Sequence, residues 1–429
     1  METSASRSSG RSIRIDSKDA VAFHRTFRDN GIIVTRSSRP TSLSTAPPAK
    51  ILLTSNPLRH EGGVVQFCNV LLQTMTCDDL QLVHQSIGSR PEYYSSWVRP
   101  ALYPFYYAAD FCRIRSLLAR DSDIRLVHAN ASLIPLPLFR DGLILALARH
   151  LGRRTVLFLH GWKDHIYQEL KRAPWRGLFR ALIQRSDEII VLAKEFRSRL
   201  IDLGAAPRRI TVLSTMFRAE DLMPLLDRTG QPPRLLFLGR ISRLKGCQEI
   251  LEAAVRLRQE GRRFELWMAG HGDRTDYFEM AQRFVADQRL DGLVRFCGRL
   301  EGREKFSAYA ESDLYLLPSW MEGCPTTVVE ALGSGLFVLA TAVGALPEII
   351  HDRGMDGNGL FVNVRDACDL ASKLAWTLDH LDHIRARRLA IQTEALARFE
   401  AAVVTAKLAC IYRSLLNGTD RNTPETVTL

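Results

Sequence analysis

The fold is decided by the segment Arg234-Leu-Leu-Phe-Leu-Gly239-Arg240-Ile-Ser-Arg243-Leu-Lys245-Gly246. An apolar strand ends in Gly239-Arg240, and Lys245-Gly246 then opens a helix, so the segment predicts one strand–turn–helix unit. The glycines let the backbone approach a ligand closely, and the two cations suit a diphosphate. A chance clustering of surface charge is the alternative interpretation of the same residues.

The same unit recurs on both sides of this segment. Short runs rich in valine, isoleucine and leucine alternate with helix-length stretches, which is typical of buried parallel strands joined by helices. The expected strands lie over residues 51–54, 80–84, 126–128, 155–160, 188–192, 210–213, 235–238, 265–268, 294–297, 314–317, 337–340 and 360–362. The sequence therefore predicts an α/β fold with two Rossmann-like domains, each a doubly wound parallel sheet, facing a central cleft where such sheets bind ligands.

Changes in composition set the expected domain boundaries. The first 47 residues are rich in Ser, Arg, Thr and Pro and predict a disordered tail, because they lack a periodic apolar pattern. A transit peptide is the rival interpretation, but three aspartates in this stretch argue against it. The expected units are the tail over 1–47, a first Rossmann-like domain over 48–226, a linker over 227–233, a second Rossmann-like domain over 234–398, a helix over 399–416 that packs back on the first domain, and a polar tail over 417–429.

The overall composition is that of a soluble globular protein. Apolar residues make up 46% and charged residues 24% of the 429 residues. No apolar run reaches the roughly 18 residues that a membrane span needs. The eight cysteines form neither a CxxC pair nor the spacing of a secreted disulfide scaffold. We therefore expect a cytoplasmic protein with reduced thiols.

The formal net charge is +11, and the excess is concentrated in the first half of the chain. Residues 140–199 hold thirteen basic and six acidic side chains. Such an excess suits an anionic membrane surface, a phosphorylated acceptor or nucleic acid. No nucleic-acid-binding motif accompanies it, so nucleic acid is not expected as a partner. Ordinary solvated helix faces would give the same count.

A second constellation lies in Ser319-Trp-Met-Glu322-Gly323-Cys324-Pro325-Thr326-Thr327-Val-Val-Glu330-Ala331. Glu322 stands in a Gly/Pro turn after an expected strand, and Glu330 lies inside the helix that this turn begins. Pro325 suits a first helical turn, and the free amides of the next residues would present the positive end of the helix dipole to an anion. Two solvated helix carboxylates are the plainer interpretation. They leave unexplained why Glu330 sits among apolar neighbours, where a carboxylate needs a dedicated partner.

With these motifs the sequence resembles the large GT-B family of retaining nucleotide-sugar glycosyltransferases, which includes many bacterial cell-surface polysaccharide enzymes. The resemblance lies in two glutamates separated by seven residues, preceded upstream by Gly-Arg and Lys-Gly. It covers roughly residues 50–400 and is weaker in the first domain. It implies transfer of a sugar from a UDP- or GDP-linked donor to a saccharide or lipid-linked saccharide acceptor. It also implies that the domain over 48–226 binds the acceptor and that the domain over 234–398 binds the nucleotide-sugar.

The resemblance also implies roles for single residues. Glu322 would contact the donor sugar, Glu330 the ribose hydroxyls, and Arg240 and Lys245 the diphosphate. The turn between the glutamates would surround the phosphates, with the contributing residues Gly323, Cys324, Pro325, Thr326 and Thr327. Cys324-Pro325 departs from the aromatic-Gly pair that is commoner in the family, which removes one possible backbone donor.

The first domain carries two further matches to the family. Gly62-Gly63 matches the glycine loop that covers the phosphates from the opposite domain, and His160 matches a histidine at a strand end close to the transferred sugar. A loop with Gly344, Leu346 and Glu348 resembles the family's next glycine-containing loop. From pattern alone, His160 could equally be a structural histidine and Gly62-Gly63 an ordinary loop.

The implied chemistry is retaining and needs no cofactor. No carboxylate pair has the arrangement of a glycosidase acid and nucleophile, so front-face attack is expected. Arg240, Lys245 and the helix dipole at Thr326 would stabilise the departing diphosphate, so we expect no metal. A phosphorylase-like enzyme, a dinucleotide oxidoreductase and a non-catalytic nucleotide-sugar binder are the rivals. The first two lack their lysine and glycine motifs, while the binder shares the fold.

One segment predicts a membrane contact. Trp175, Leu178, Phe179 and Leu182 fall on one helical face, with Arg172, Arg176 and Arg180 beside them. This is the pattern of a helix lying in the plane of a membrane surface. The family resemblance implies the inner face of the cell membrane, because many members extend lipid-linked saccharides there, so peripheral attachment is expected. A helix packing on its own sheet with its arginines in water is the alternative.

Overall fold

The structure is a computed structural model of the 429-residue chain. It describes residues 32–34, 47–60, 62–88, 99–133, 135–162, 164–272 and 276–418. Most of the predicted tails over 1–47 and 417–429 therefore lies outside the described residues. One part of the first tail differs from the prediction: Ile32–Val34 forms strand β1, which pairs antiparallel with β3. Three consecutive β-branched residues favour this edge pairing.

The first sheet has seven strands in the order β1-β3-β2-β4-β5-β6-β7, all parallel except β1. Its remaining strands are β2 (Ala49–Ser55), β3 (Leu80–Ser86), β4 (Ile124–Ser132), β5 (Arg154–Gly161), β6 (Glu188–Val191) and β7 (Ile210–Val212). The strand order reverses at β2, since the chain passes to β3 on one side and later to β4 on the other.

The second sheet is fully parallel and has the order β10-β9-β8-β11-β12-β13. Its strands are β8 (Arg234–Leu238), β9 (Glu265–Ala269), β10 (Val294–Gly298), β11 (Leu314–Leu317), β12 (Phe337–Thr341) and β13 (Gly359–Val362). Here the order reverses between β8 and β11. Because such crossovers are right-handed, the two directions of winding place helices on opposite faces of the sheet.

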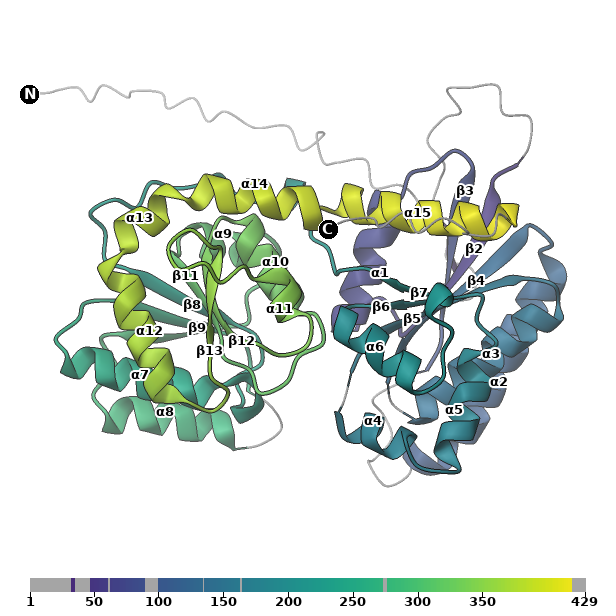
Figure 1. Cartoon of the computed structure of the whole chain (residues 1–429), viewed down its shortest axis with the longest axis horizontal. Helices are drawn as coiled ribbons and strands as arrows, with labels where there is room; N and C mark the ends of the chain where they lie inside the picture. Colours follow the sequence, from purple (N-terminus) through teal and green to yellow (C-terminus); the bar gives the residue numbers. More distant parts are fainter. Residues whose placement is uncertain are drawn as a thin grey trace, which may run out of the picture.

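Fifteen α-helices of the described residues cover the two sheets (Figure 1). In the first domain they are α1 (Gly63–Thr74), α2 (Arg99–Arg120), α3 (Pro135–His150), α4 (Asp164–Leu170), α5 (Trp175–Ile183) and α6 (Lys194–Asp202). In the second they are α7 (Cys247–Gln259), α8 (Tyr277–Asp287), α9 (Gly302–Ala310), α10 (Thr326–Gly333), α11 (Leu346–Ile349), α12 (Ala367–Asp379), α13 (Leu381–Ala386) and α14 (Arg388–Phe399), followed by α15 (Ala401–Asn417).

The central strands are buried on both faces, which explains why their sequences lack polar alternation. Every residue of β6, β11 and β12 is buried. The predicted fold class, two Rossmann-like doubly wound domains, is confirmed, and each predicted strand lies within or next to an observed one. Helices α13 and α14 meet at Arg387.

The last two helices run along both domains. In Figure 1, α14 lies over the second domain and α15 continues in the same direction over the first. Tyr412 of α15 is fully buried there, and its hydroxyl lies 2.5 Å from Nδ1 of His128 on β4. Arg413 pairs with Asp79 at 2.7 Å. The chain thus returns to the first domain after completing the second.

The segment between the domains is tied to the second one. Arg228 is only 6% exposed, and its guanidinium lies 3.2 Å from the Asp313 carboxylate, which Arg385 also contacts at 2.9 Å. A buried carboxylate shared by two guanidinium groups is a paired charge rather than a solvated one. The polar residues of this segment therefore hold it against the second domain.

Helix α5 corrects the predicted membrane anchor. Phe179 and Leu182 are 2% and 6% exposed, so these two residues of the apolar face lie inside the protein. A Cβ atom on Gly142 of α3 would stand 2.5 Å from the Leu182 side chain, which shows how closely the two helices pack. Trp175 is half exposed, and Arg172, Arg176 and Arg180 face outward. The apolar face is used for packing within the domain because its sheet needs cover.

Candidate functional site

The two domains meet at the carboxyl ends of their strands, and among the described residues three of the hydrogen bonds between them involve predicted site residues. Gln66 of α1 donates to Glu330 of α10 at 2.8 Å. The hydroxyls of Thr215 and Thr326 lie 3.1 Å apart. The amide of Lys194, at the start of α6, donates to the carboxylate of Glu348. The predicted loop with Gly344, Leu346 and Glu348 therefore reaches the first domain through a helix N-terminus.

The turn after β8 forms as predicted from its glycines and cations. Gly246 has φ 73°, and a Cβ there would lie 2.1 Å from the carbonyl oxygen of Pro318, so only glycine fits without strain. This close approach sets Lys245 beside the turn that follows β11. Arg240 is exposed at the end of β8, whereas Lys245 is half-buried. Both cations lie at the switch point of the second sheet, where open α/β sheets bind ligands.

Glu322 is paired with Lys245, the lysine that the family resemblance assigns to the diphosphate. Lys245 Nζ donates to Glu322 Oε1 at 2.6 Å, and the Ser319 hydroxyl donates to the same oxygen at 2.7 Å. The side chain of Glu322 is only 8% exposed, so its negative charge is largely shielded from water. Gly344 (φ 59°) supports this turn, since a Cβ there would lie 2.3 Å from the Glu322 carbonyl oxygen.

The turn between the glutamates ends in the N-terminus of α10. Pro325 is the N-cap residue and Thr326 the first helical residue. The amides of Thr326 and Thr327 belong to the first turn, whose N–H groups have no acceptor four residues earlier within the helix. Burial raises the pKa of the Cys324 thiol to about 12, so this side chain is a neutral thiol at physiological pH. The N-terminus of α10 can accept an anion with its backbone dipoles.

Glu330 has three donors. Its Oε1 accepts from Lys305 Nζ at 2.7 Å and from Gln66 Nε2 at 2.8 Å, and its Oε2 accepts from the Tyr309 hydroxyl at 3.2 Å. The side chain is 2% exposed. The carboxylate predicted to need a dedicated partner therefore has one cation and two neutral donors. Lys305 supplies the compensating charge that a buried carboxylate requires.

Gly62 and Gly63 lie at the start of α1. Gly62 precedes α1 with φ 130°, which a residue with a side chain rarely adopts, and Gly63 is the first residue of the helix. Both are exposed, and Gln66 one turn later contacts Glu330. The glycine loop thus starts the helix that reaches the second domain.

His160 is the last but one residue of β5, and its backbone touches the second domain. A Cβ on Gly323 would stand 3.2 Å from the His160 carbonyl oxygen. The ring nitrogen Nε2 donates to Asn130 Oδ1 at 2.8 Å, an orientation fixed because Asn130 Nδ2 donates to Thr54 O at 3.3 Å. Burial, with a smaller contribution from His128, keeps the pKa of His160 well below its usual range. The ring is therefore neutral, with the proton on Nε2.

The structure adds residues that the sequence did not single out. Gln66, Lys305 and Tyr309 hold Glu330, Ser319 holds Glu322, and Thr215 meets Thr326. Ser319 lies three residues from Glu322 within the quoted motif, so its position there is the one local signal. The other residues have ordinary roles in their own elements, and only the tertiary contacts reveal them.

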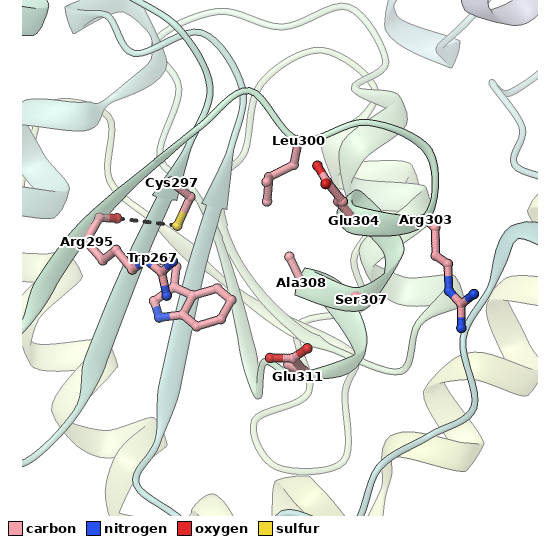
Figure 2. A pocket seen from close by; sticks show the side chains of 9 residues that line it. All are labelled: Trp267, Arg295, Cys297, Leu300, Arg303, Glu304, Ser307, Ala308 and Glu311. Atoms are coloured by element: carbon pink, nitrogen blue, oxygen red, sulfur yellow. Dashed lines mark hydrogen bonds between the residues drawn. The ribbon is translucent and has the colours of Figure 1, made fainter. Parts of the chain in front are cut away.

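A pocket of about 340 Å³ lies on the other side of α9 and is separate from this interface (Figure 2). Figure 2 shows Trp267 of β9 facing α9 across it, and the lining residues are Trp267, Arg295, Cys297, Leu300, Arg303, Glu304, Ser307, Ala308 and Glu311. The α9 residues of this list recur at helical spacing on one face. Lys305 and Tyr309 project from a different face, towards Glu330.

Metal-holding clusters and membrane-spanning helices are both absent from the residues that the structure describes. Among them no three His, Cys, Asp or Glu side chains come together as a metal-holding group. None of their helices combines the length and the apolar character needed to cross a membrane.

Solved structures share the arrangement of the whole chain. Sucrose-phosphate synthase from Thermosynechococcus elongatus superposes with a TM-score of 0.70 at 18% identity, covering 86% of this chain and 100% of that one. Anabaena HepE, solved with UDP and glucose, superposes with a TM-score of 0.65 at 14% identity, covering 85% and 100%. At such identities the likeness establishes the fold.

Curated relatives are similar over part of their length. The amylovoran biosynthesis glycosyltransferase AmsK of Erwinia amylovora is 29% identical over 211 residues, 47% of this chain and 49% of the relative. The phosphatidyl-myo-inositol mannosyltransferase of Mycolicibacterium smegmatis is 30% identical over 195 residues, 45% and 48% of the two chains. The matched region thus spans about half the length of these curated relatives.

Family models match both domains. Residues 70–215 match the glycosyl transferase 4-like domain, and residues 232–380 match the group 1 glycosyl transferases. The second match contains Arg240, Lys245, Glu322 and Glu330 in the geometry described above. With both halves matched and the two-domain fold in place, the chain belongs to the group 1 glycosyl transferases of GT-B fold.

Proposed function

We propose that this protein is a retaining glycosyltransferase that moves a sugar from a UDP- or GDP-linked donor to a saccharide or lipid-linked saccharide acceptor in bacterial surface polysaccharide biosynthesis. The observation that carries the proposal is the meeting of Lys245 and Glu322 at 2.6 Å beside the N-terminus of α10. A cation, a carboxylate and free helix amides at one switch point suit a sugar diphosphate. Two similar proteins support this choice, since AmsK is a glycosyltransferase of amylovoran biosynthesis and HepE was solved with UDP and glucose.

Each end of the donor has a matching group at the interface. The diphosphate would lie against Arg240, Lys245 and the amides of Thr326 and Thr327, with Gly62-Gly63 covering it from the first domain. The sugar would lie against Glu322 near His160, and the ribose against Glu330. Lys245 would lie between the diphosphate and the carboxylate of Glu322, so the same cation would serve both parts of the donor.

The proposed transfer retains the configuration of the donor sugar. The acceptor hydroxyl attacks the anomeric carbon on the side from which the diphosphate leaves, the bond from that carbon to the phosphate oxygen breaks, and that oxygen takes the acceptor proton. Glu322 is held by Lys245 and Ser319, an arrangement that suits a ligand-orienting carboxylate. The neutral His160 ring donates from Nε2 to Asn130, which favours a positioning role for this residue.

We further propose that transfer needs no divalent metal, because Arg240, Lys245 and the α10 dipole can offset the charge that grows on the diphosphate. Activity should persist in excess EDTA. Loss of activity on chelation, with recovery on adding magnesium or manganese, would overturn this part of the proposal.

Nucleoside diphosphate release tests the function. UDP- and GDP-hexoses would be mixed with the full chain in the presence and absence of lipid-linked saccharide acceptors, and release should depend on the acceptor. Thermal shift with UDP and GDP provides the binding measurement, since a ligand at 100 times its dissociation constant adds about 2.7 kcal/mol of stability. Binding without turnover across the acceptor panel would favour the second candidate, a nucleotide-sugar-binding protein that shares the family residues.

Peripheral contact with an anionic membrane remains a proposal that rests on charge, because Phe179 and Leu182 of α5 are buried. Arg172, Arg176 and Arg180 are exposed, and each basic residue near an anionic surface contributes about 1 kcal/mol. We expect cosedimentation with anionic liposomes at low salt and release at about 0.5 M salt, where screening is short-ranged. Replacing the three arginines with serine should abolish it. Unchanged sedimentation of the triple variant would show that this surface is not the contact.

A further inference from the structure

The carboxylate of Glu330 is closed off by both domains at once. With the side chain 2% exposed, no ligand hydroxyl can reach its oxygens while all three present donors remain in place. Its Oε1 already accepts two hydrogen bonds, one from Lys305 and one from Gln66. A carboxylate oxygen offers about two lone-pair sites, so Oε1 is saturated. A ligand hydroxyl can therefore bind Oε1 only by displacing Lys305 or Gln66.

The three donors differ in how readily they can leave. Tyr309 is fully buried, and its hydroxyl hydrogen is shared between Glu330 and the carbonyl oxygen of Thr327. Lys305 carries the charge that offsets the buried carboxylate, and moving it away would leave that carboxylate uncompensated. Gln66 is neutral and partly exposed, and it belongs to the other domain. Gln66 is the donor whose departure costs least.

From this we infer that Gln66 is a gate on the ribose site: its amide occupies the place on Glu330 Oε1 that a ribose hydroxyl of the donor takes. The inference rests on the proposed function, because it assumes that Glu330 receives the ribose. Binding of the nucleotide then exchanges the hydrogen bond between the domains for one to the ligand. The donor site is thereby coupled to the contact between α1 and α10.

If Gln66 is a gate, replacing it should strengthen nucleotide binding rather than weaken it. Gln66→Ala removes the competing amide and keeps a good helix former in α1. Affinity for UDP or GDP should therefore rise by about tenfold, the lower end of the factor that a hydrogen bond to a charged group represents. A residue that helped to hold the nucleotide would show the opposite sign.

The experiment is calorimetric titration of the full chain with UDP and GDP and with their 2′,3′-dideoxy analogues. The matched control is Gln73→Ala, an exposed glutamine two turns further along the same helix. We expect Gln66→Ala to bind the ribose form about tenfold more tightly than the wild type and to bind the dideoxy form unchanged. Gln73→Ala should match the wild type with both ligands.

Other outcomes would overturn the inference separately from the function. If the wild type binds UDP or GDP and Gln66→Ala binds it equally or more weakly, the gate is wrong while the proposed function stands. An equal gain for the dideoxy analogues would also overturn it, because competition would not involve the ribose hydroxyls. If the wild type binds neither nucleotide, both the gate and the proposed function fall.

Discussion

At the residue scale, the site consists of charges that neutralise one another. Lys245 lies against Glu322, and Lys305 lies against Glu330. The carboxylates are almost fully buried, whereas the lysines keep 31% and 15% of their side chains exposed, so the lysines can adjust towards an incoming anion. A buried carboxylate is stable only beside its cation. Replacing either member of a pair is therefore expected to change both function and stability.

Lys245→Ala should lower turnover by about 10²–10³-fold, the usual cost of removing one group that stabilises transition-state charge. Steady-state kinetics with the correct donor would measure it. Arg243→Ala, an exposed arginine in the same turn, is the control and should stay within about twofold of the wild type. Activity of Lys245→Ala close to that of the control would contradict the assignment.

Glu330→Ala should weaken nucleotide binding and also lower the free energy of unfolding. Breaking a buried ion pair costs about 3–5 kcal/mol, and the partial exposure of Lys305 places the expected loss at about 2–3 kcal/mol. Urea denaturation measures the loss. In a Lys305→Met background the same change should cost clearly less, since no cation is left unpaired. An equal cost in both backgrounds would show that the pair does not stabilise the fold.

At the element scale, three strands of the first sheet each carry a histidine whose surroundings exclude water. His84 lies on β3, His128 on β4 and His160 on β5, and desolvation lowers the pKa of all three. The pKa of His84 falls to about 4 and that of His128 to about 3. The folded chain keeps these rings neutral at pH values where the unfolded chain protonates them, so the first domain is sensitive to acid.

The sign of this effect follows from the lowered pKa values. Below pH 6.5 the unfolded state binds protons that the folded state does not, so stability falls as the pH drops towards 4 and 3. Each histidine adds a slope of about 1.4 kcal/mol per pH unit in this window. His128→Gln should remove about that much of the slope between pH 6 and 5 in urea denaturation. His150→Gln, an exposed histidine of α3, should leave the slope unchanged; equal slopes in all three proteins would contradict the prediction.

At the scale of the whole molecule, α15 makes the first domain depend on the last residues of the chain. Its Tyr412 meets His128 on β4, and His128 lies 6.0 Å from the ring of Phe158, which in turn stacks on His160 at 3.8 Å. This row of rings joins the C-terminal helix to the interface. A change in α15 therefore reaches the candidate site through packed side chains.

Tyr412→Ala should lower the unfolding free energy by about 3–5 kcal/mol, as large-to-small changes of buried aromatic residues do. Tyr412→Phe should cost about 1–3 kcal/mol, because it leaves the buried His128 without its hydrogen bond. Thermal and urea denaturation would measure both. Cys410→Ala, an exposed position on the same helix, is the control and should change stability little. A loss for Tyr412→Ala no larger than that of the control would mean that α15 does not support the first domain.

Local patterns explain how much of the fold could be predicted. Runs such as Leu314–Leu317 are apolar throughout because both faces of the strand are covered, and that signal depends on neighbouring residues only. The same holds for the turn at Gly246 and for the helix that begins after Pro325. The fold class and the positions of the two glutamates relative to strand and helix follow from such patterns.

Helix α5 shows where local patterns give no answer. Its apolar face and its arginines fit a membrane surface and a protein interior equally well, and the sequence does not state which of the two covers it. The packing of Leu182 against Gly142 of α3 decides between them, and those residues lie far apart in the chain. An amphipathic pattern indicates that one side of a helix is buried. Which surface buries that side is decided by the tertiary structure.

The sequence by itself determined two parallel sheets, a hinge between them and the residues that follow β8 and β11. Each of these depends on periodicity, turn chemistry or spacing within about thirty residues. Only the tertiary structure decided the partners of these residues. Gln66 and Glu330 are 264 positions apart. The residues around either one in the sequence do not indicate that the two side chains are in contact. Their contact depends on the packing of two domains, and packing is a property of the assembled chain.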